Sequence, residues 1–173
     1  MAEGAISHVV FTVKNSRYDW QRIKRQKPVS FIAPTFPFFE KEEEEFLIKI
    51  LCDIAIELGL NIAAFNFCGD HVHAVLIKDN SDISKIIGLW KGKSAYLYNH
   101  RIQILNVNSQ SKNLKIDIQN LWAKGFYQKR ILSTTELENV IYYVNNNRKK
   151  HGLAPLTSFS TKIISTLINS KKE

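Results

Sequence analysis

No hydrophobic run in this chain approaches the roughly 20 consecutive apolar residues that a membrane-spanning helix requires, so no membrane partner is expected. Only two cysteines, Cys52 and Cys68, are present, which excludes a disulfide framework and predicts reduced thiols in a cytoplasmic protein. The first residues lack the basic and apolar regions of a secretory leader. Internal repeats and a clear linker are also missing. With 173 residues, 45% of them hydrophobic, one globular domain spanning residues 1–173 is predicted.

Acidic residues are in the minority, and the net charge of +8 favours a polyanionic partner. The basic residues gather in four segments, residues 14–27, 85–101, 124–130 and 148–150. Aromatic residues such as Trp90, Tyr96 and Trp122 lie within or beside these segments. Cations that hold phosphates and rings that stack on unpaired bases are typical of single-stranded nucleic-acid binding. A solvated basic surface with its aromatics in the core accounts for the same composition, and composition alone leaves both interpretations open.

Hydrophobic periodicity predicts the order β-α-β-β-α-β-α. Alternating or β-branched segments predict strands at residues 6–13, 61–67, 71–78 and 125–132. Helical spacing predicts helices at residues 42–58, 82–98 and 134–151. Residues 157–169 are a candidate for one more short helix after this order, and residues 103–119 carry no clear pattern. This order is the ferredoxin-like β-α-β-β-α-β arrangement, an α+β fold with one antiparallel sheet and helices against one face. A C-terminal helix that carries Tyr143 is expected to follow this arrangement. The fold hosts many functions, so the chemistry has to come from the site.

Two histidines two positions apart form the first candidate site. His71 and His73 lie in a predicted strand, where side chains alternate between faces, so both rings project from the same face. Two neutral imidazoles side by side supply half of a divalent-metal site. The pair alone is weak evidence, because short motifs recur by chance. Cys68 is a weaker candidate ligand, because the turn residues Gly69 and Asp70 separate it from His71.

A second constellation lies on the last long predicted helix. At about 100° per residue, Tyr143 and Asn147 point in nearly the same direction, at the edge of the apolar stripe. A deprotonated tyrosine is a nucleophile, and a nearby divalent cation would lower its pKa. The amide oxygen of Asn147 is a hard ligand that could join the two imidazoles. Taken singly, Tyr143 as a packing residue and Asn147 as an exposed polar residue remain the simpler interpretations.

These motifs together resemble the single-tyrosine His-hydrophobic-His transposases of bacterial insertion sequences. Gly69-Asp-His-Val-His-Ala-Val-Leu76 looks like the family's histidine strand, and Tyr143-Val-Asn-Asn-Asn147 with Gly152-Leu153 looks like its tyrosine helix. Trp122-Ala-Lys-Gly-Phe-Tyr-Gln-Lys-Arg130, Lys91-Gly-Lys-Ser94 and His8-Val-Val-Phe11 resemble segments of the branch associated with repetitive extragenic palindromes, the REP branch. The resemblance covers about residues 6 to 154, with the motifs in the family's order. Five motifs in register are specific where one is not.

The chain departs from the family pattern at a few positions. Arg148 stands where the family usually has proline, and Asn15-Ser-Arg17 is a loose version of a lysine-tyrosine-arginine stretch. Insertion-sequence members often have glutamine at the position of Asn147, whereas the REP branch has asparagine. None of these differences removes a group that the chemistry needs.

The resemblance implies a mechanism and a set of partners. His71, His73 and Asn147 would hold Mg²⁺ or Mn²⁺, and Tyr143 would attack single-stranded DNA to give a 5′-phosphotyrosine link and a free 3′-hydroxyl. The protein would act in the bacterial cytoplasm, associated with the nucleoid when bound to DNA. The residues expected to contact the backbone of single-stranded or hairpin DNA are Arg17, Lys91, Lys93, Arg101, Lys129, Arg130 and Lys149.

Three questions stay open on sequence alone. Relatives work either as homodimers, in which the tyrosine serves the partner's histidines, or as monomers acting in cis. A domesticated protein that binds hairpins without cutting them is the first alternative function. A hydrolytic metalloenzyme that leaves no protein-linked product is the second.

Overall fold

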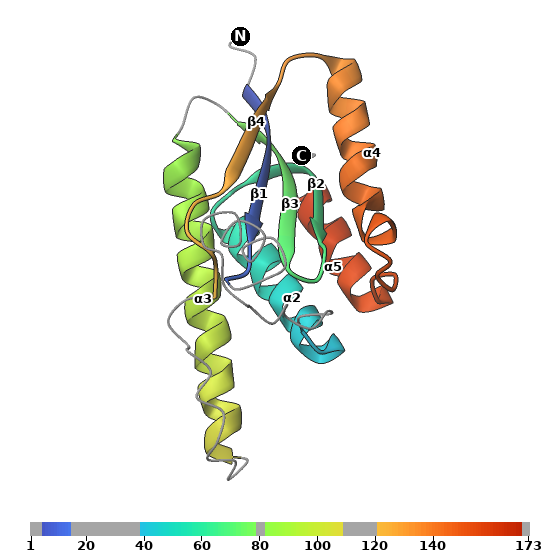
Figure 1. Ribbon diagram of the computed structural model, residues 1–173. Helices are drawn as coiled ribbons and strands as arrows, with labels where there is room; N and C mark the ends of the chain where they lie inside the picture. Colours follow the sequence, from blue (N-terminus) through green and yellow to red (C-terminus); the bar gives the residue numbers. More distant parts are fainter. Residues whose placement is uncertain (1–4, 15–38, 79–81, 109–120, 171–173) are drawn as a thin grey trace, which may run out of the picture.

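The computed structural model describes residues 5–14, 39–78, 82–108 and 121–170 of the chain. Strand β1 (Ala5–Thr12) is followed by helix α2 (Lys41–Glu57) and by the hairpin of β2 (Asn61–Phe67) and β3 (His71–Lys78). Helix α3 (Ile83–Asn108) leads to β4 (Tyr127–Ile131), then to α4 (Thr134–Lys150) and α5 (Ser158–Asn169). The predicted order of elements is therefore confirmed (Figure 1). Helix α3 is longer than predicted, because it continues past Tyr98 to Asn108.

The four strands form one antiparallel sheet in the order β2-β3-β1-β4. The central strands β1 and β3 pair along their whole length, so the histidine strand lies in the middle of the sheet. A tight turn joins β2 to β3, and Gly69 supplies the positive φ of 77° that such a turn needs. This arrangement is the predicted ferredoxin-like α+β fold.

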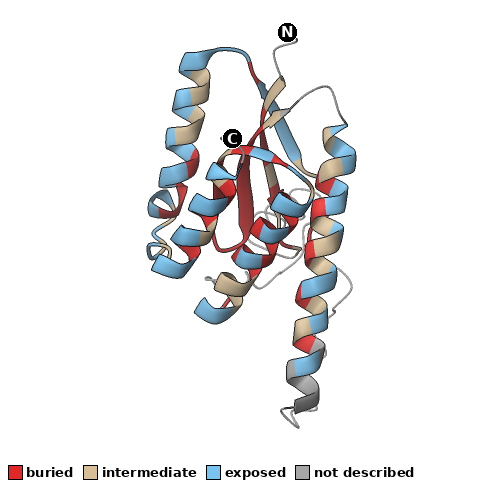
Figure 2. Ribbon diagram, turned by 180° about the vertical axis from the view of Figure 1, so that it is seen from behind, coloured by how far each residue is buried: buried red, intermediate tan, exposed pale blue. Residues whose placement is uncertain are grey.

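One face of the sheet packs against α2 and α3. Alternate residues of the strands, among them Phe11, Phe67 and Val72, form the main core together with the apolar sides of these helices. Trp90 of α3 lies in the centre of this core, fully buried, and its indole N–H donates to the carbonyl of Leu51 at 2.8 Å. Strands enclosed between helical layers account for the buried centre of the molecule in Figure 2.

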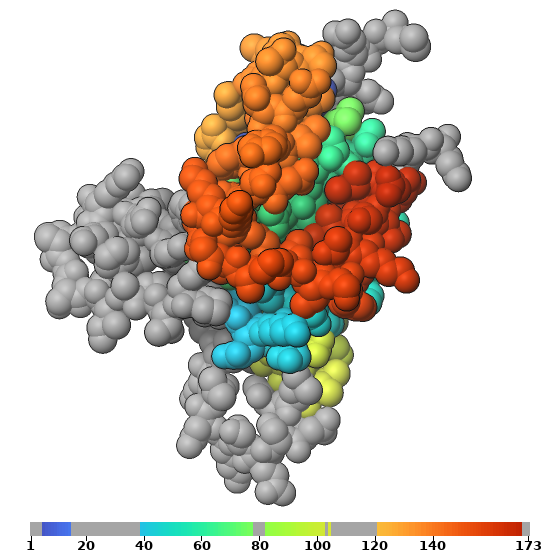
Figure 3. Space-filling model, turned by 90° about the vertical axis from the view of Figure 1, so that its right-hand side faces the viewer, coloured from blue at the N-terminus to red at the C-terminus, as the bar shows by residue number. Residues whose placement is uncertain are grey.

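The two helices of the ferredoxin-like core, α2 and α3, share one face of the sheet as predicted, and the C-terminal tyrosine helix α4 covers the opposite face. The reason lies in the strands, because Ala64, Val75 and Ile131 make that face apolar as well. Val144 of α4 packs on these residues and is fully buried. Helix α4 lies mainly over β2 and β3, while α5 packs beside α2 and β2. In Figure 3 α4 and α5 are both seen on the side of the molecule that faces the viewer. Within the described ranges, no helix is long and apolar enough to cross a bilayer.

Candidate functional site

The two histidine rings of β3 lie under α4, buried and held in fixed orientations. Nδ1 of His71 lies 2.7 Å from a carboxylate oxygen of Asp70, which is itself fully buried. Nδ1 of His73 lies 2.9 Å from Nε2 of His8, the residue of β1 that faces the same side of the sheet. Each ring therefore uses Nδ1 for an orienting contact, which leaves both Nε2 atoms directed at α4. Burial, with the neighbouring His71 and His8 rings, lowers the pKa of His73 to about 2, so its imidazole is neutral.

The side chain of Asn147 descends from α4 to these two Nε2 atoms. Its amide nitrogen lies 2.5 Å from Nε2 of His73 and 3.5 Å from Nε2 of His71. Its amide oxygen is buried and has no hydrogen-bond partner among the described residues. Rotation of the amide by 180° exchanges its oxygen and nitrogen. The amide oxygen and the two Nε2 atoms then direct their lone pairs at one point. Two imidazole nitrogens and an amide oxygen are suitable ligands for a divalent cation, so the residues present fit one.

Tyr143 lies one helical turn before Asn147, beside the same histidines. Its ring meets the edge of His73 with centroids 5.5 Å apart and that of His8 at 6.1 Å. The side chain is 38% exposed, so the phenol borders solvent. Burial, with a smaller effect of the Cys68 thiol, raises the pKa of Tyr143 above its ordinary value. The phenol is consequently protonated at neutral pH and has to lose its proton before it can act as a nucleophile.

A cleft of about 750 Å³ opens beside the tyrosine and the histidines. Its floor is the half of the sheet made by β1 and β4, and Val140 and Tyr143 of α4 form one wall. The loop of residues 124–126 forms the opposite wall, with Lys124 exposed to solvent. The volume falls within the range of small-molecule sites, about 300–1,000 Å³. The cleft therefore offers a route to the histidines for a ligand lying along β1 and β4.

Helix α3 holds the loop wall of this cleft in place. The ammonium of Lys91 donates to the carbonyls of Ala123 and Gly125 at 2.7 and 2.6 Å. One turn further along α3, the hydroxyl of Ser94 accepts the indole N–H of Trp122 at 2.9 Å. The two sequence motifs that contain these residues thus contact one another. They attach the loop to α3 at two points.

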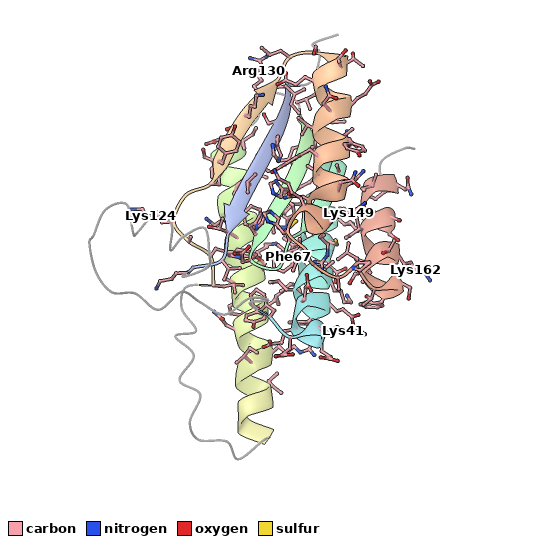
Figure 4. The ribbon with its side chains drawn as sticks, turned by 45° about the vertical axis from the view of Figure 1, so that its right-hand side comes forward. Lys41, Phe67, Lys124, Arg130, Lys149 and Lys162 are labelled. Carbon is pink, nitrogen blue, oxygen red and sulfur yellow. The ribbon has the colours of Figure 1, made fainter. Side chains whose placement is uncertain are left out.

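The structure brings together all four predicted catalytic and metal-binding residues, Tyr143, His71, His73 and Asn147, although their roles stay predictions. The predicted DNA-binding residues are more dispersed. Of these, Lys91 donates to the loop, Lys93 pairs with Glu57, Arg101 stacks on Phe46, Lys129 pairs with Glu136, and Arg130 and Lys149 are exposed. Figure 4 shows Arg130 near one end of β4, Lys124 before its other end, and Lys149 on α4. Arg17 lies outside the described residues.

Three residues near the histidines were missed or undervalued by the sequence analysis. His8 and Asp70 orient the rings, and the ring of His151 lies 5.2 Å from that of His71. Asp70 stands directly before His71 in the sequence, so the adjacency was a usable signal. His8 carried no comparable signal, because its pairing with His73 depends on the register between β1 and β3.

Fold and site together have the parts that the sequence motifs associate with single-tyrosine transposases: a histidine pair on a central strand and a helix that presents tyrosine and asparagine to it. The chain belongs to the family described as "Transposase IS200 like", whose sequence profile matches residues 3–147. The family resemblance inferred from the motifs is thereby confirmed, and the chain is a member of a family of DNA-processing enzymes.

Two solved structures are similar to this chain, and the first of them supports the fold. A REP-associated tyrosine transposase bound to a REP hairpin superposes with a TM-score of 0.53 at 15% identity, covering 88% of this chain and 71% of that one. An inferred transposase from Deinococcus radiodurans R1 gives a TM-score of 0.48 at 20% identity, covering 86% of this chain and 93% of that one. No curated protein matches the sequence.

Proposed function

We propose that this chain is a metal-dependent single-stranded DNA endonuclease and transposase that cleaves and rejoins DNA through a 5′-phosphotyrosine intermediate. The observation that carries the proposal is the contact of Tyr143 with His73 in the same chain, beside two Nε2 atoms that converge on Asn147. A nucleophile next to a set of metal ligands, at the edge of an open cleft, suits phosphoryl transfer. Membership of a transposase family supports the same activity.

Each residue of the site would have a separate task. His71, His73 and Asn147 would hold Mg²⁺ or Mn²⁺, which when bound would polarise a phosphate and favour the deprotonated phenol. Asp70 and His8 would fix the orientation of the two imidazoles. The Tyr143 oxygen would form a bond to phosphorus while the 3′-oxygen leaves. Because the ester bond to tyrosine retains the energy of the phosphodiester, a second 3′-hydroxyl could displace the phenol without ATP.

The DNA partner is proposed to be a single strand that carries a hairpin. The structure of the similar REP-associated transposase contains a hairpin, and this chain places exposed Lys124, Arg130 and Lys149 around the cleft and its flanking elements. Such cations contribute a sequence-independent, salt-sensitive attraction to phosphates. Since Tyr143 already lies beside the histidines of its own chain, we also propose that one chain, residues 1–173, is sufficient for cleavage in cis.

The test is the formation of a covalent protein–DNA product with Mn²⁺. Because the target is unknown, the substrate is a pool of single strands with one hairpin stem and randomised flanks, labelled at the 3′ end. We expect a protein-linked band on a denaturing gel that is lost with EDTA. The same pool labelled at the 5′ end should give a free fragment with an extendable 3′-hydroxyl. Cleavage without any linked product would indicate hydrolysis, and binding without cleavage would indicate a domesticated hairpin-binding protein.

The buried carboxylate of Asp70 offers a test of the metal site that is independent of DNA. Asp70→Asn keeps the shape but removes the charge that orients His71, and losses of this kind reduce metal affinity about 10–100-fold. We expect Mn²⁺ affinity, measured by calorimetry, to fall by that factor. Asp53→Asn, on the solvent side of α2, is the matched control and should leave it unchanged. Equal Mn²⁺ affinity in the two variants would show that the Asp70 carboxylate does not orient His71 for metal binding.

A further inference from the structure

Cys68 lies in the turn that connects the two strands below the site. Its backbone N–H donates to the carbonyl of His71 at 2.8 Å, which closes the hairpin. Asn66 pairs with His73 across the sheet, so Cys68, two positions further on, shares the face of the histidines. The residue is completely buried. Its thiol is consequently fixed beneath α4, on the same side as the two rings.

The thiol of Cys68 and the two rings form a cluster of potential ligand atoms. Its sulfur and one nitrogen each of His71 and His73 all lie within 4.8 Å of one another, and this is the one group of three His, Cys, Asp or Glu ligands found among the described residues. Bond lengths of about 2.3 Å to sulfur and about 2.1 Å to nitrogen place the ligands of a tetrahedral ion about 3.6 Å apart. The cluster therefore needs a contraction of about 1 Å to enclose an ion.

The amide nitrogen of Asn147 lies where such an ion would bind. It is close to Nε2 of both histidines, and the thiol of Cys68 belongs to the same cluster of ligand atoms. One donor group thus lies beside two imidazole nitrogens and one sulfur, while the amide oxygen has no hydrogen-bond partner in the part of the chain that the structure describes. A cation at this point would satisfy the same three acceptors, and it would give the buried oxygen a role after the amide turns.

We propose that Cys68 is a metal ligand, so that the ion is bound by the sulfur of Cys68, the Nε2 atoms of His71 and His73, and the amide oxygen of Asn147. The proposal rests on the metal site of the proposed function and extends it by one ligand. His71 and His73 line the cleft but Cys68 and Asn147 do not, so the side facing the cleft stays open for a phosphate oxygen. On coordination the thiol transfers its proton to solvent.

A sulfur ligand changes which ions the site selects. Mg²⁺ binds almost only to oxygen, whereas Zn²⁺ and Co²⁺ accept thiolate and imidazole together. The chain should consequently bind Zn²⁺ and Co²⁺ in preference to Mg²⁺. Two imidazoles favour the same ions, so the feature that separates the proposed ligand set from one made of His71, His73 and Asn147 alone is the metal–sulfur bond itself.

Cobalt titration of the full chain under argon tests the proposal without DNA or activity. Co²⁺ gives visible d–d bands with any ligand set in a low-symmetry site, and a near-ultraviolet charge-transfer band only when sulfur is bound. We expect both bands in the unmodified chain. Cys68→Ser should lose the near-ultraviolet band and bind Zn²⁺ more than about 10-fold more weakly, with Mn²⁺ affinity little changed. Cys52→Ser is the matched control, because Cys52 is equally buried but lies in α2, and it should behave as the unmodified chain.

The outcomes distinguish this proposal from the function on which it rests. Visible bands without a near-ultraviolet band in the unmodified chain would overturn ligation by Cys68, whether or not Cys68→Ser folds, and would leave the three-residue site intact. The same conclusion follows if Cys68→Ser is folded by circular dichroism and retains the near-ultraviolet band. Absence of any cobalt spectrum would overturn both this proposal and the proposed metal site.

Discussion

Tyr143→Phe is expected to abolish the covalent protein–DNA product and to leave DNA binding essentially intact. The substitution removes only the phenolic oxygen, so the ring keeps its edge contacts with His73 and His8. Loss of a nucleophile removes the covalent pathway altogether, and comparable substitutions cost at least about 10³-fold in rate. The measurements are the fraction of labelled strand linked to protein with Mn²⁺, and hairpin affinity by a gel-shift assay.

Tyr142→Phe is the matched control for this experiment. Tyr142 is the neighbouring residue of α4, but its side chain is 71% exposed and points away from the histidines. It should form the linked product at the normal rate. If Tyr143→Phe forms the product as well as the unmodified chain, another residue is the nucleophile and the proposed mechanism is wrong. If both variants fail, the defect lies in the helix and not in one oxygen.

Arg148→Ala is expected to cause the largest loss of stability of any substitution near the site. Arg148 is 8% exposed, and its guanidinium pairs with Glu44 of α2 and donates to the carbonyls of Phe67 and Ala154. Removal of the cation leaves a mostly buried carboxylate and two carbonyls without their partner. Breaking a buried pair in this way costs about 3 kcal/mol of unfolding free energy, or about 10 °C in Tm for a domain of this size. Thermal and denaturant unfolding measure the change.

Loss of the Arg148 contacts should also weaken metal binding at the proposed site. Asn147 precedes Arg148 on α4, and Cys68 follows Phe67, so the guanidinium ties together the two segments that carry these side chains. We expect Arg148→Ala to weaken Mn²⁺ binding even at temperatures where the variant is folded. Lys149→Ala is the control, because Lys149 is exposed and its removal should change stability by less than about 0.5 kcal/mol. Equal stability of the two variants would show that the Arg148 contacts contribute little.

The contacts of Arg148 also account for a departure from the family pattern. The family usually has proline at this position, and the side chain of proline cannot form an ion pair. In this chain Arg148, which the sequence analysis grouped with Lys149 and Lys150 in one basic segment, has a buried side chain. Its guanidinium connects α4 to α2 and to the end of β2. Charge patterning predicts that three consecutive cations are exposed. It cannot show that one of them, Arg148, forms an ion pair with Glu44 on a helix distant in the sequence.

Local patterns were sufficient for the hairpin and for the start of α4. Strands β2 and β3 were predicted residue for residue, because alternation and a glycine turn specify them locally. Ser133 caps the start of α4, since the backbone N–H of Glu136 donates to the Ser133 hydroxyl at 3.1 Å. The Glu136 carboxylate accepts from Leu132, one residue before the cap, and not from Ser133 itself. Propensity therefore located the helix, while its final hydrogen bonds depended on how β4 approaches it.

The site was predicted in part, because helical and strand geometry determine which side chains share a face but not which faces meet. Tyr143 and Asn147 could be paired from their spacing, and His71 and His73 from theirs. The contact of His8 with His73 required the register of β1 on β3, which alternation leaves open. Lys91 was predicted to contact DNA from its charge and its place in a family-like motif. Its hydrogen bonds to Ala123 and Gly125 depend on a loop more than thirty positions away.

Two attachments to α3 couple the loop wall of the cleft to the hydrophobic core in which α3 is packed. Lys91 and Ser94 lie one turn apart on a helix whose Trp90 is locked against Phe11 and Phe65. The width of the cleft therefore depends on how α3 packs against the sheet, and not on the conformational preferences of the loop itself. Selection for a differently shaped nucleic acid would act on buried apolar positions of α3 as much as on residues that touch the substrate.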